Sequence, residues 1–176
     1  MTLKGSARQI LRSSWVLAVV CAIGACAVWA LQLNFAGPTP EEYAARRPQV
    51  EIIAPGAFDA GHGRLACGRA PTVLDPGFED YAAAFFGFLI VNPERFRVLP
   101  PTVQRFAFAH ECGHQFVGYS EIAADCYAAR LGRKQGWLGP NELREVCAFF
   151  EQSKGSPFHL PGPQRCAAIR QCYGLL

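Results

Sequence analysis

The chain has 176 residues, of which 51% are hydrophobic, and its formal net charge at pH 7 is +3. This length and composition predict one folded domain with a hydrophobic core, and they exclude a globally disordered chain. The charge is mild and no basic cluster with a nucleic-acid-binding motif is visible, so we expect no nucleic-acid partner.

The N-terminus carries a membrane-targeting pattern. Residues 1–14 include three basic residues and no acid, and residues 15–33, "WVLAVVCAIGACAVWALQL", have no formal charge. As a helix of about 28 Å, the second segment would match the roughly 30 Å hydrocarbon core of a bilayer. We therefore expect a cytoplasmic N-terminus at 1–14 and a single-pass signal anchor in the cell inner membrane at 15–33, with the rest of the chain facing the periplasm or the exterior. A cleaved signal peptide and a lipoprotein signal ending at Cys26 are the open alternatives.

A proline-rich stretch, "NFAGPTPEEYAARRPQV" at residues 34–50, predicts a linker. The folded domain is expected at residues 51–176. Within it, the first part of "FEDYAAAFFGFLIVNPERF" is compatible with the start of a helix, and "FFGFLIV" predicts one buried strand closed by the turn at "NP". This strand belongs either to the core or to the edge of a substrate cleft.

Four stretches of helical length complete the domain. The first begins at Pro101, which suits the start of a helix, and ends near Gly118. Ser120 is expected to cap the second helix, and Gly132 to end it. The third spans about residues 141–152, and the fourth carries "PQRCAAIRQCY". The predicted fold class is therefore α+β, mostly helical with a small sheet.

Cysteine usage supports export. Two of the eight cysteines lie in the apolar N-terminal segment, and the expected exported part holds the other six, namely Cys67, Cys112, Cys126, Cys147, Cys166 and Cys172. An even set in an exported domain predicts disulfides, and we expect at least two, with the connectivity open. Cys166 and Cys172 face different ways on one predicted helix, so we expect them to have different partners.

The first predicted helix carries "HECGH", which fits the pattern H-E-x-x-H. His110 and His114 lie one turn apart on the same helix face, so both imidazoles can reach one metal ion. Glu111 is rotated by about 100°, which suits a general base acting on a water activated by Zn2+. Cys112 lies on the opposite face, which favours a disulfide or a core position over metal binding. The alternative is a helix with core histidines and surface acids.

The second predicted helix supplies a third metal ligand. A short turn folds this helix back beside the first, which brings Glu121 near His114. Asp125 lies one turn beyond Glu121 and can accept a hydrogen bond from the free ring nitrogen of a ligating histidine. The alternatives are an acid placed favourably at a helix N-terminus for Glu121, and a helix-surface carboxylate for Asp125.

"HECGH" followed by "EIAAD" resembles the gluzincin metallopeptidases, which combine H-E-x-x-H with a downstream glutamate in an E-x-x-x-D helix. "FHLPGPQRC" is similar to a late segment of the CAAX-prenyl-endopeptidase and heat-shock membrane-protease class. The resemblance implies a zincin-like fold and zinc-dependent hydrolysis of peptide or protein substrates. It also implies that His159 helps to stabilise the oxyanion and that Arg165 supports the site.

Two other functions are compatible with the sequence. The first is a non-catalytic zinc-binding envelope protein, whose fourth coordination position would be closed by a further group. The second is a disulfide-stapled interaction module without a metal. The remaining histidine, His62 in "DAGHGRLACG", has no spaced partner and is expected to be a loop residue.

Overall fold

The computed structural model describes residues 37–157 and 159–174, and a compact unit begins at Pro38. The predicted cytoplasmic segment 1–14 and the predicted signal anchor 15–33 lie outside the described residues. Among the helices of the described part, none is long and apolar enough to cross a membrane. In chain order the elements are α2 (Pro40–Ala45), β1 (Glu51–Ile53), β2 (Phe58–Asp59), β3 (Arg64–Leu65), β4 (Thr72–Leu74), β5 (Ala82–Phe85), β6 (Phe88–Val91), α3 (Pro93–Arg97), α4 (Pro101–Val117), α5 (Glu121–Gln135), α6 (Pro140–Glu151) and α7 (Gly162–Gly174).

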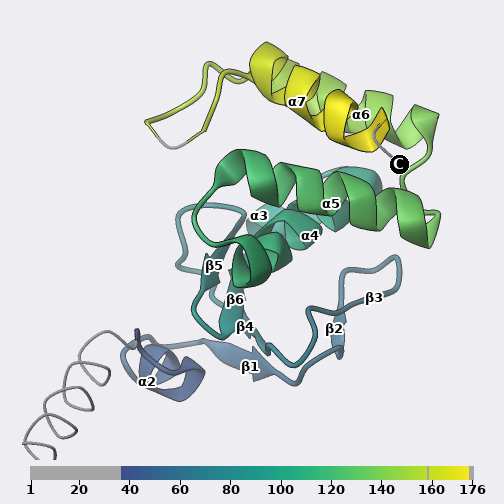
Figure 1. The fold of residues 1–176 in the computed structure, drawn as a ribbon. Coiled ribbons are helices and arrows are strands. Elements are labelled where there is room, and N and C mark those ends of the chain that lie inside the picture. The colour runs from purple at the N-terminus through teal and green to yellow at the C-terminus, as the bar shows by residue number, and fades with distance from the viewer. Residues whose placement is uncertain (1–36, 158, 175–176) are drawn as a thin grey trace, which may run out of the picture. The chain divides into compact units, whose positions relative to one another are not determined.

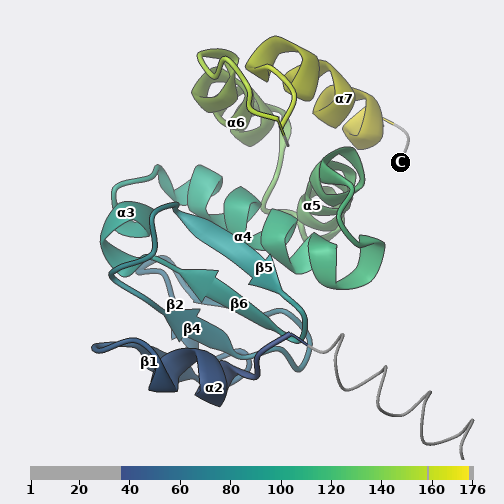
Figure 2. The same cartoon turned by 90° about the vertical axis from the view of Figure 1, so that its left-hand side faces the viewer.

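The main sheet has four strands in the order β1-β4-β6-β5. Strands β4 and β6 run parallel, whereas β1 with β4 and β5 with β6 run antiparallel. Strand β5 therefore forms one edge of the sheet. Figure 2 shows α4 across one face of this sheet and α2 against the opposite face. A mixed sheet with helices packed on it confirms the α+β class.

Strand β6 is buried on both faces, which explains its uninterrupted apolar sequence. Leu89 and Val91 belong to the cluster under α4, and Phe88 and Ile90 belong to the cluster on the α2 side. The prediction of a buried strand is confirmed for this segment. The prediction was wrong in extending the strand back over the preceding residues, because Gly87 adopts a φ of +87° and turns the chain into a β5–β6 hairpin. The same hairpin overturns the expected helix start, since Ala82–Phe85 is a strand.

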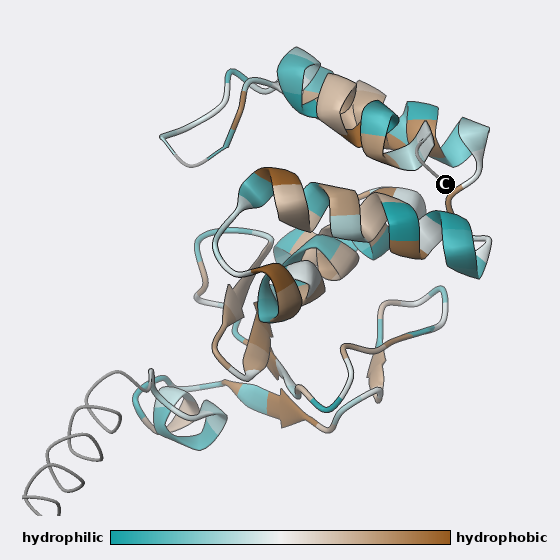
Figure 3. Cartoon of the chain, in the orientation of Figure 1, coloured by the Kyte–Doolittle hydropathy of each residue, from teal (hydrophilic) through white to brown (hydrophobic). Residues whose placement is uncertain are grey.

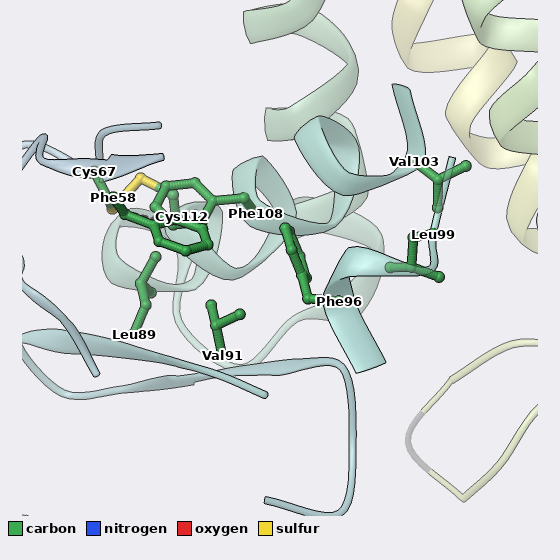
Figure 4. Packing of buried hydrophobic residues seen from close by; sticks show 9 residues of the cluster. All are labelled: Phe58, Cys67, Leu89, Val91, Phe96, Leu99, Val103, Phe108 and Cys112. Atoms are coloured by element: carbon green, nitrogen blue, oxygen red, sulfur yellow. Dashed lines mark hydrogen bonds between the residues drawn. A yellow bond between two sulfur atoms is a disulfide. The ribbon is translucent and has the colours of Figure 1, made fainter. Parts of the chain in front are cut away.

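Helix α4 packs on the sheet through a hydrophobic cluster that includes Phe58, Phe96 and Phe108 (Figure 4). Phe58 and Phe108 stack with ring centroids 5.7 Å apart, above the side chains of Leu89 and Val91. A disulfide between Cys67 and Cys112 ties the same face of α4 to the loop after β3. This packing fixes α4 as a rigid base for the residues on its other face.

Helices α5, α6 and α7 form a second layer on α4, around a core that includes Phe106, Ala128 and Ile169. A disulfide between Cys126 and Cys172 joins α5 to α7. The described residues thus hold two disulfides, which confirms the expected minimum. Cys172 pairs with Cys126, whereas Cys166 is a free thiol, so these two cysteines do not share a partner. Cys112 is a disulfide residue, as predicted.

The helix ends follow the sequence with one exception. Helix α4 ends before Gly118, whose φ is 70°, and the side chain of Ser120 caps α5 by accepting from the Ala123 N–H at 3.3 Å. The expected end of α5 at Gly132 was wrong. This glycine lies inside the helix, and Gly136 ends it in the left-handed conformation.

The segment predicted as a linker contains α2, which belongs to the folded unit. Tyr43 of α2 is buried, and its hydroxyl donates to Asp75 Oδ2 at 2.6 Å. Arg47 Nη1 donates to the same oxygen at 2.7 Å. The expectation of a linker therefore fails for residues 40–47. Although the neighbouring sequence is polar, the side chain of Tyr43 packs on the sheet.

Candidate metal centre

Helix α4 presents two histidines on the face that is turned away from the Cys67–Cys112 disulfide. The rings of His110 and His114 stack edge to face with centroids 4.8 Å apart, and their Nε2 atoms are 3.1 Å apart. His110 is 3% exposed. Two imidazole nitrogens at this distance need a proton or a cation between them, because two lone pairs repel.

The partners of the Nδ1 atoms fix the protonation of both rings. His110 Nδ1 lies 2.8 Å from Asp125 Oδ1, and His114 Nδ1 lies 2.7 Å from the Gly118 carbonyl oxygen. A carboxylate and a carbonyl only accept hydrogen bonds, so each Nδ1 donates a proton. In the neutral rings both Nε2 atoms therefore carry lone pairs, which is the tautomer that a metal ligand requires.

Helix α5 adds a carboxylate to these two lone pairs. Glu121, the first residue after the Ser120 cap, places Oε2 3.1 Å from His110 Nε2 and Oε1 3.4 Å from His114 Nε2. Its Oε2 atom is buried, and within the described part of the chain no donor reaches it with good hydrogen-bond geometry, although the Nε2 atoms of His110 and His159 lie 3.1 and 3.0 Å away. A buried acceptor without a donor is costly unless a cation neutralises it.

Three electron-pair donors thus converge from two helices. Donor atoms that share a tetrahedral zinc ion at bonds of about 2.0–2.1 Å lie about 3.3 Å apart. The observed separations, 3.1 Å from His110 to His114 and 3.1 and 3.4 Å from these rings to Glu121, fall around that value. One proton can satisfy one of these contacts, whereas one cation satisfies all three.

A buried ion pair between Asp125 and Arg165 contacts the Nδ1 side of the His110 ring. Asp125 is 2% exposed, and Arg165 of α7 grips it with two hydrogen bonds, Nε to Oδ2 and Nη2 to Oδ1, both of 2.7 Å. Burial opposes ionisation of Asp125, but the hydrogen bonds from His110 and Arg165 outweigh it and hold the pKa of Asp125 below its ordinary value. The carboxylate therefore stays charged and orients the His110 ring.

The pKa of His110 shows that the site stabilises a positive charge on this ring. Burial lowers its pKa, but the hydrogen bonds with Asp125 and Glu121 outweigh burial and raise the pKa to about 9. In Glu121 the balance is similar, since burial raises its pKa and the contact with His110 lowers it below the ordinary value. The site thus stabilises a cation next to an ionised Glu121.

Glu111 follows His110 on α4 and lines the same groove. Burial raises the pKa of Glu111, although the neighbouring His110 and His114 lower it. A carboxyl group whose pKa is raised is suited to accept a proton and to return it as a general base.

The loop between α6 and α7 brings His159 to the site. Its Nε2 lies 3.0 Å from Glu121 Oε2, and the donor atoms of His110, Glu121 and His159 all lie within 4.8 Å of one another. Ser156 positions the ring, since its Oγ accepts from the His159 backbone N–H at 3.0 Å and lies 3.2 Å from His159 Nδ1. Burial lowers the pKa of His159, which keeps this ring neutral at pH 7.

Two hollows meet at these residues. A groove of about 790 Å³ runs along β5 towards the C-terminal end of α4, and its lining includes Phe78, Ala83, Phe86 and Tyr119. A second hollow of about 270 Å³ runs in the opposite direction along α4, beneath the α6–α7 loop. His110, Glu111 and His159 line both. The site therefore lies along a continuous cleft between the edge of the sheet and the helical layer.

Comparisons of the chain with protein-family models, with curated proteins and with solved structures give no match. The geometry of the site shows a group of side chains that could hold a metal ion, namely His110, Glu121 and His159.

All of the residues singled out in the sequence for the site lie together, namely His110, Glu111, His114, Glu121, Asp125, His159 and Arg165. His62, expected to be a loop residue, lies between β2 and β3, where its carbonyl accepts from Arg105. Sequence reasoning missed Ser156 and the Gly118 carbonyl. The serine three residues before His159 is a local pattern that could have indicated a capped turn.

Proposed function

We propose that the chain is a zinc-dependent peptidase of the gluzincin type with a zincin-like fold. The convergence of His110 Nε2, His114 Nε2 and the Glu121 carboxylate carries this proposal, because in the neutral rings both Nε2 atoms carry lone pairs that point to the same place as the carboxylate oxygens. Two nitrogens and a carboxylate oxygen are a ligand set typical of catalytic zinc, which keeps a position open for water. When bound there, zinc supplies an activated water and a Lewis acid for a substrate carbonyl.

The residues of the chain supply the proton transfers. Glu111 accepts a proton from the water as the water oxygen attacks the peptide carbonyl carbon. The same carboxyl group then gives that proton to the leaving amine nitrogen as the carbon–nitrogen bond breaks, which regenerates the carboxylate. His159 donates a hydrogen bond to the carbonyl oxygen as that oxygen gains negative charge. Asp125 and Arg165 hold His110 in its tautomer throughout.

The cleft favours an extended peptide or protein substrate. Strand β5 is an edge strand, and an extended chain can pair with such an edge through backbone hydrogen bonds. Alanines 82–84 leave room for it, and Phe78, Phe86 and Phe116 make the groove wall apolar. Figure 3 shows hydrophobic residues, in brown, at the C-terminal end of α4 and at the start of α5. In these segments Phe116 is 62% and Ile122 49% exposed. We therefore expect preference for substrates with large apolar side chains.

The proposed location is the cell inner membrane, with the domain on the periplasmic or exterior side. The uncharged segment 15–33 would anchor the protein, and the two disulfides are compatible with an oxidising compartment. A membrane-tethered peptidase acts on substrates that reach the membrane surface.

A non-catalytic metal-binding function is the second candidate. It is favoured by the position of His159, whose Nε2 is 3.0 Å from Glu121 Oε2 and which belongs to the group able to hold a metal. If His159 were a fourth ligand, the coordination would be closed and no position would remain for water.

The test uses the full-length protein in detergent, purified without chelators. We expect about one zinc per chain by elemental analysis and hydrolysis of fluorogenic peptides with large apolar residues. Glu111→Gln should keep the zinc and lose at least about 10²-fold in kcat/KM. Glu145→Gln, which removes an exposed carboxylate from α6, is the matched control. Zinc binding with equal hydrolysis by parent and Glu111→Gln would refute the assigned mechanism, and zinc without any hydrolysis would favour the non-catalytic function.

A further inference from the structure

Two cysteines of the domain are thiols, and they lie against each other. Cys147 of α6 is 0% exposed and Cys166 of α7 is 1% exposed. The thiol of Cys166 donates to the Cys147 carbonyl oxygen, with Sγ and O 3.4 Å apart. Helices α6 and α7 lie side by side in both views (Figures 1 and 2).

The electrostatics of Cys166 agree with this proximity. Burial raises the pKa of the Cys166 thiol to about 12, and the neighbouring Cys147 adds to this rise. The remaining cysteines of the described domain are already paired, as Cys67–Cys112 and Cys126–Cys172. The alternative is a pair of small buried hydrophobic residues, which is a common use of cysteine. Two buried thiols on adjacent helices, one of them in contact with the backbone of the other, favour a bond between them in a domain whose other described cysteines are oxidised.

We propose that Cys147 and Cys166 form a third disulfide, made by exchange with a dithiol–disulfide oxidant of the exported compartment. The thiolate of one cysteine attacks the disulfide of the oxidant and forms a mixed disulfide, and the second cysteine then displaces the oxidant. The two thiols together lose two protons and two electrons, and the oxidant leaves as a dithiol. The new bond is the sulfur–sulfur bond between α6 and α7.

Burial sets the order of events. A thiolate is the reactive form, and both thiols are enclosed in the folded domain. The exchange therefore takes place while the chain is still folding, before α6 and α7 close on each other. Once formed, the bond is shielded from reductants by the same packing.

The bond would brace the loop that carries His159. Cys147 precedes this loop and Cys166 follows it, and Arg165, which grips Asp125, is the neighbour of Cys166. A disulfide between the two helices would restrict the motion of both ends of the loop and of the adjacent Arg165 side chain. The disulfide itself does not depend on the proposed zinc chemistry, because it involves no residue of the metal centre.

The experiment maps the disulfides of the full-length protein, exported and isolated under an alkylating agent. Trypsin separates the two cysteines, since residues 145–154 ("EVCAFFEQSK") and residues 166–170 ("CAAIR") are different peptides. We expect a linked pair of these peptides that separates on reduction. Recovery of both peptides in alkylated, unlinked form would overturn the proposal. A protein that binds no zinc but shows the linked pair would overturn the proposed function alone.

Single and double variants give an independent measurement. Cys147→Ser and Cys166→Ser should each lower Tm by about 5 °C or more, and the double variant should lower it no further, because either single change removes the whole bond. Hydrogen exchange over residues 152–161 should rise equally in all three variants. Additive losses in Tm, with unchanged exchange in the loop, would show two separate packing residues and overturn the proposal.

Discussion

Arg165 of α7 and Asp125 of α5 form a two-pronged ion pair directly behind the metal centre, with both nitrogen–oxygen distances at 2.7 Å. Asp125 in turn accepts from His110 Nδ1 at 2.8 Å. The guanidinium of Arg165 also lies 4.0 Å from the centre of the Phe150 ring. A residue in the last helix thus controls the orientation of a histidine 55 positions earlier in the chain.

Arg165→Lys tests this relationship. Lysine keeps the charge but replaces the planar bidentate pair of hydrogen bonds with a single hydrogen bond. It also loses the stacking of the guanidinium on Phe150. We expect a free energy of unfolding lower by about 1–3 kcal/mol, and a lower affinity for zinc measured by chelator competition. Arg130→Lys, an exposed position on α5, is the control. Unchanged zinc affinity beside a lower stability would mean that Arg165 is structural only.

Asp125→Asn changes the partner of His110 without changing its shape. The amide oxygen can still accept from Nδ1, but the negative charge that makes Nε2 a better ligand is lost, and Arg165 meets an amide. We expect zinc affinity to fall by about 10–100-fold, measured by the same chelator competition. Glu145→Gln should leave the affinity unchanged. An Asp125→Asn variant with the affinity of the parent would show that the charge of Asp125 does not strengthen His110 as a metal ligand.

His159→Ala distinguishes the two candidate functions. If His159 donates to the substrate oxyanion, as proposed, the variant keeps about one zinc per chain and loses about 10²–10³-fold in kcat. Elemental analysis and peptide hydrolysis on the same sample give both values. Loss of the metal would instead identify His159 as a ligand, and its coordination would then close the site.

Asp75 predicts how stability depends on pH away from the site. Burial raises its pKa, but the hydrogen bonds from Tyr43, Gly77 and Arg47 outweigh burial and lower the pKa below its ordinary value. The folded state thus binds the proton more weakly than the unfolded state, whose pKa is about 3.9. The stabilisation is present above about pH 4 and is lost as the pH falls through the lower folded pKa.

Asp75→Asn should therefore unfold more easily at neutral pH, by about 1–3 kcal/mol, because Asn cannot replace the charged hydrogen bonds. The difference from the parent should shrink as the pH falls below about 4, where the parent also becomes protonated. Urea unfolding at a series of pH values measures it. A difference that stays constant from neutral to acidic pH would show that the charge of Asp75 is not the cause.

Gly132→Ala tests the packing that keeps a glycine inside α5. A Cβ at this position would lie 2.6 Å from Leu138 Cβ and 2.8 Å from Trp137 Cη2. Overpacking should cost about 1–3 kcal/mol, despite the better helix propensity of alanine. Gly174→Ala, where an added Cβ meets nothing within 4 Å, is the control and should be neutral or slightly stabilising. Equal thermal stability of the two variants would refute this account.

Short-range sequence patterns predicted much of the secondary structure and most of the candidate site residues of this protein. The i, i+4 spacing of His110 and His114 places both rings on one face of α4, and Ser120 places Glu121 at the start of α5. The apolar run of β6 and the even set of cysteines were likewise readable, because burial and oxidation leave compositional traces. Apart from the cysteine count, which is a property of composition, these features depend on residues within a few positions of each other.

Tertiary packing decided what those patterns left open. Three contacts join residues about 40 positions apart or more, a separation at which sequence periodicity carries no information. They are the Cys126–Cys172 disulfide, the ion pair of Arg165 with Asp125 and the contact of His159 with Glu121. The same holds for α2, whose Tyr43 reaches Asp75 across the sheet, and for Gly132, which remains helical because Trp137 and Leu138 pack against its bare Cα. Local backbone preferences of about 1 kcal/mol decide an element only where such packing does not override them.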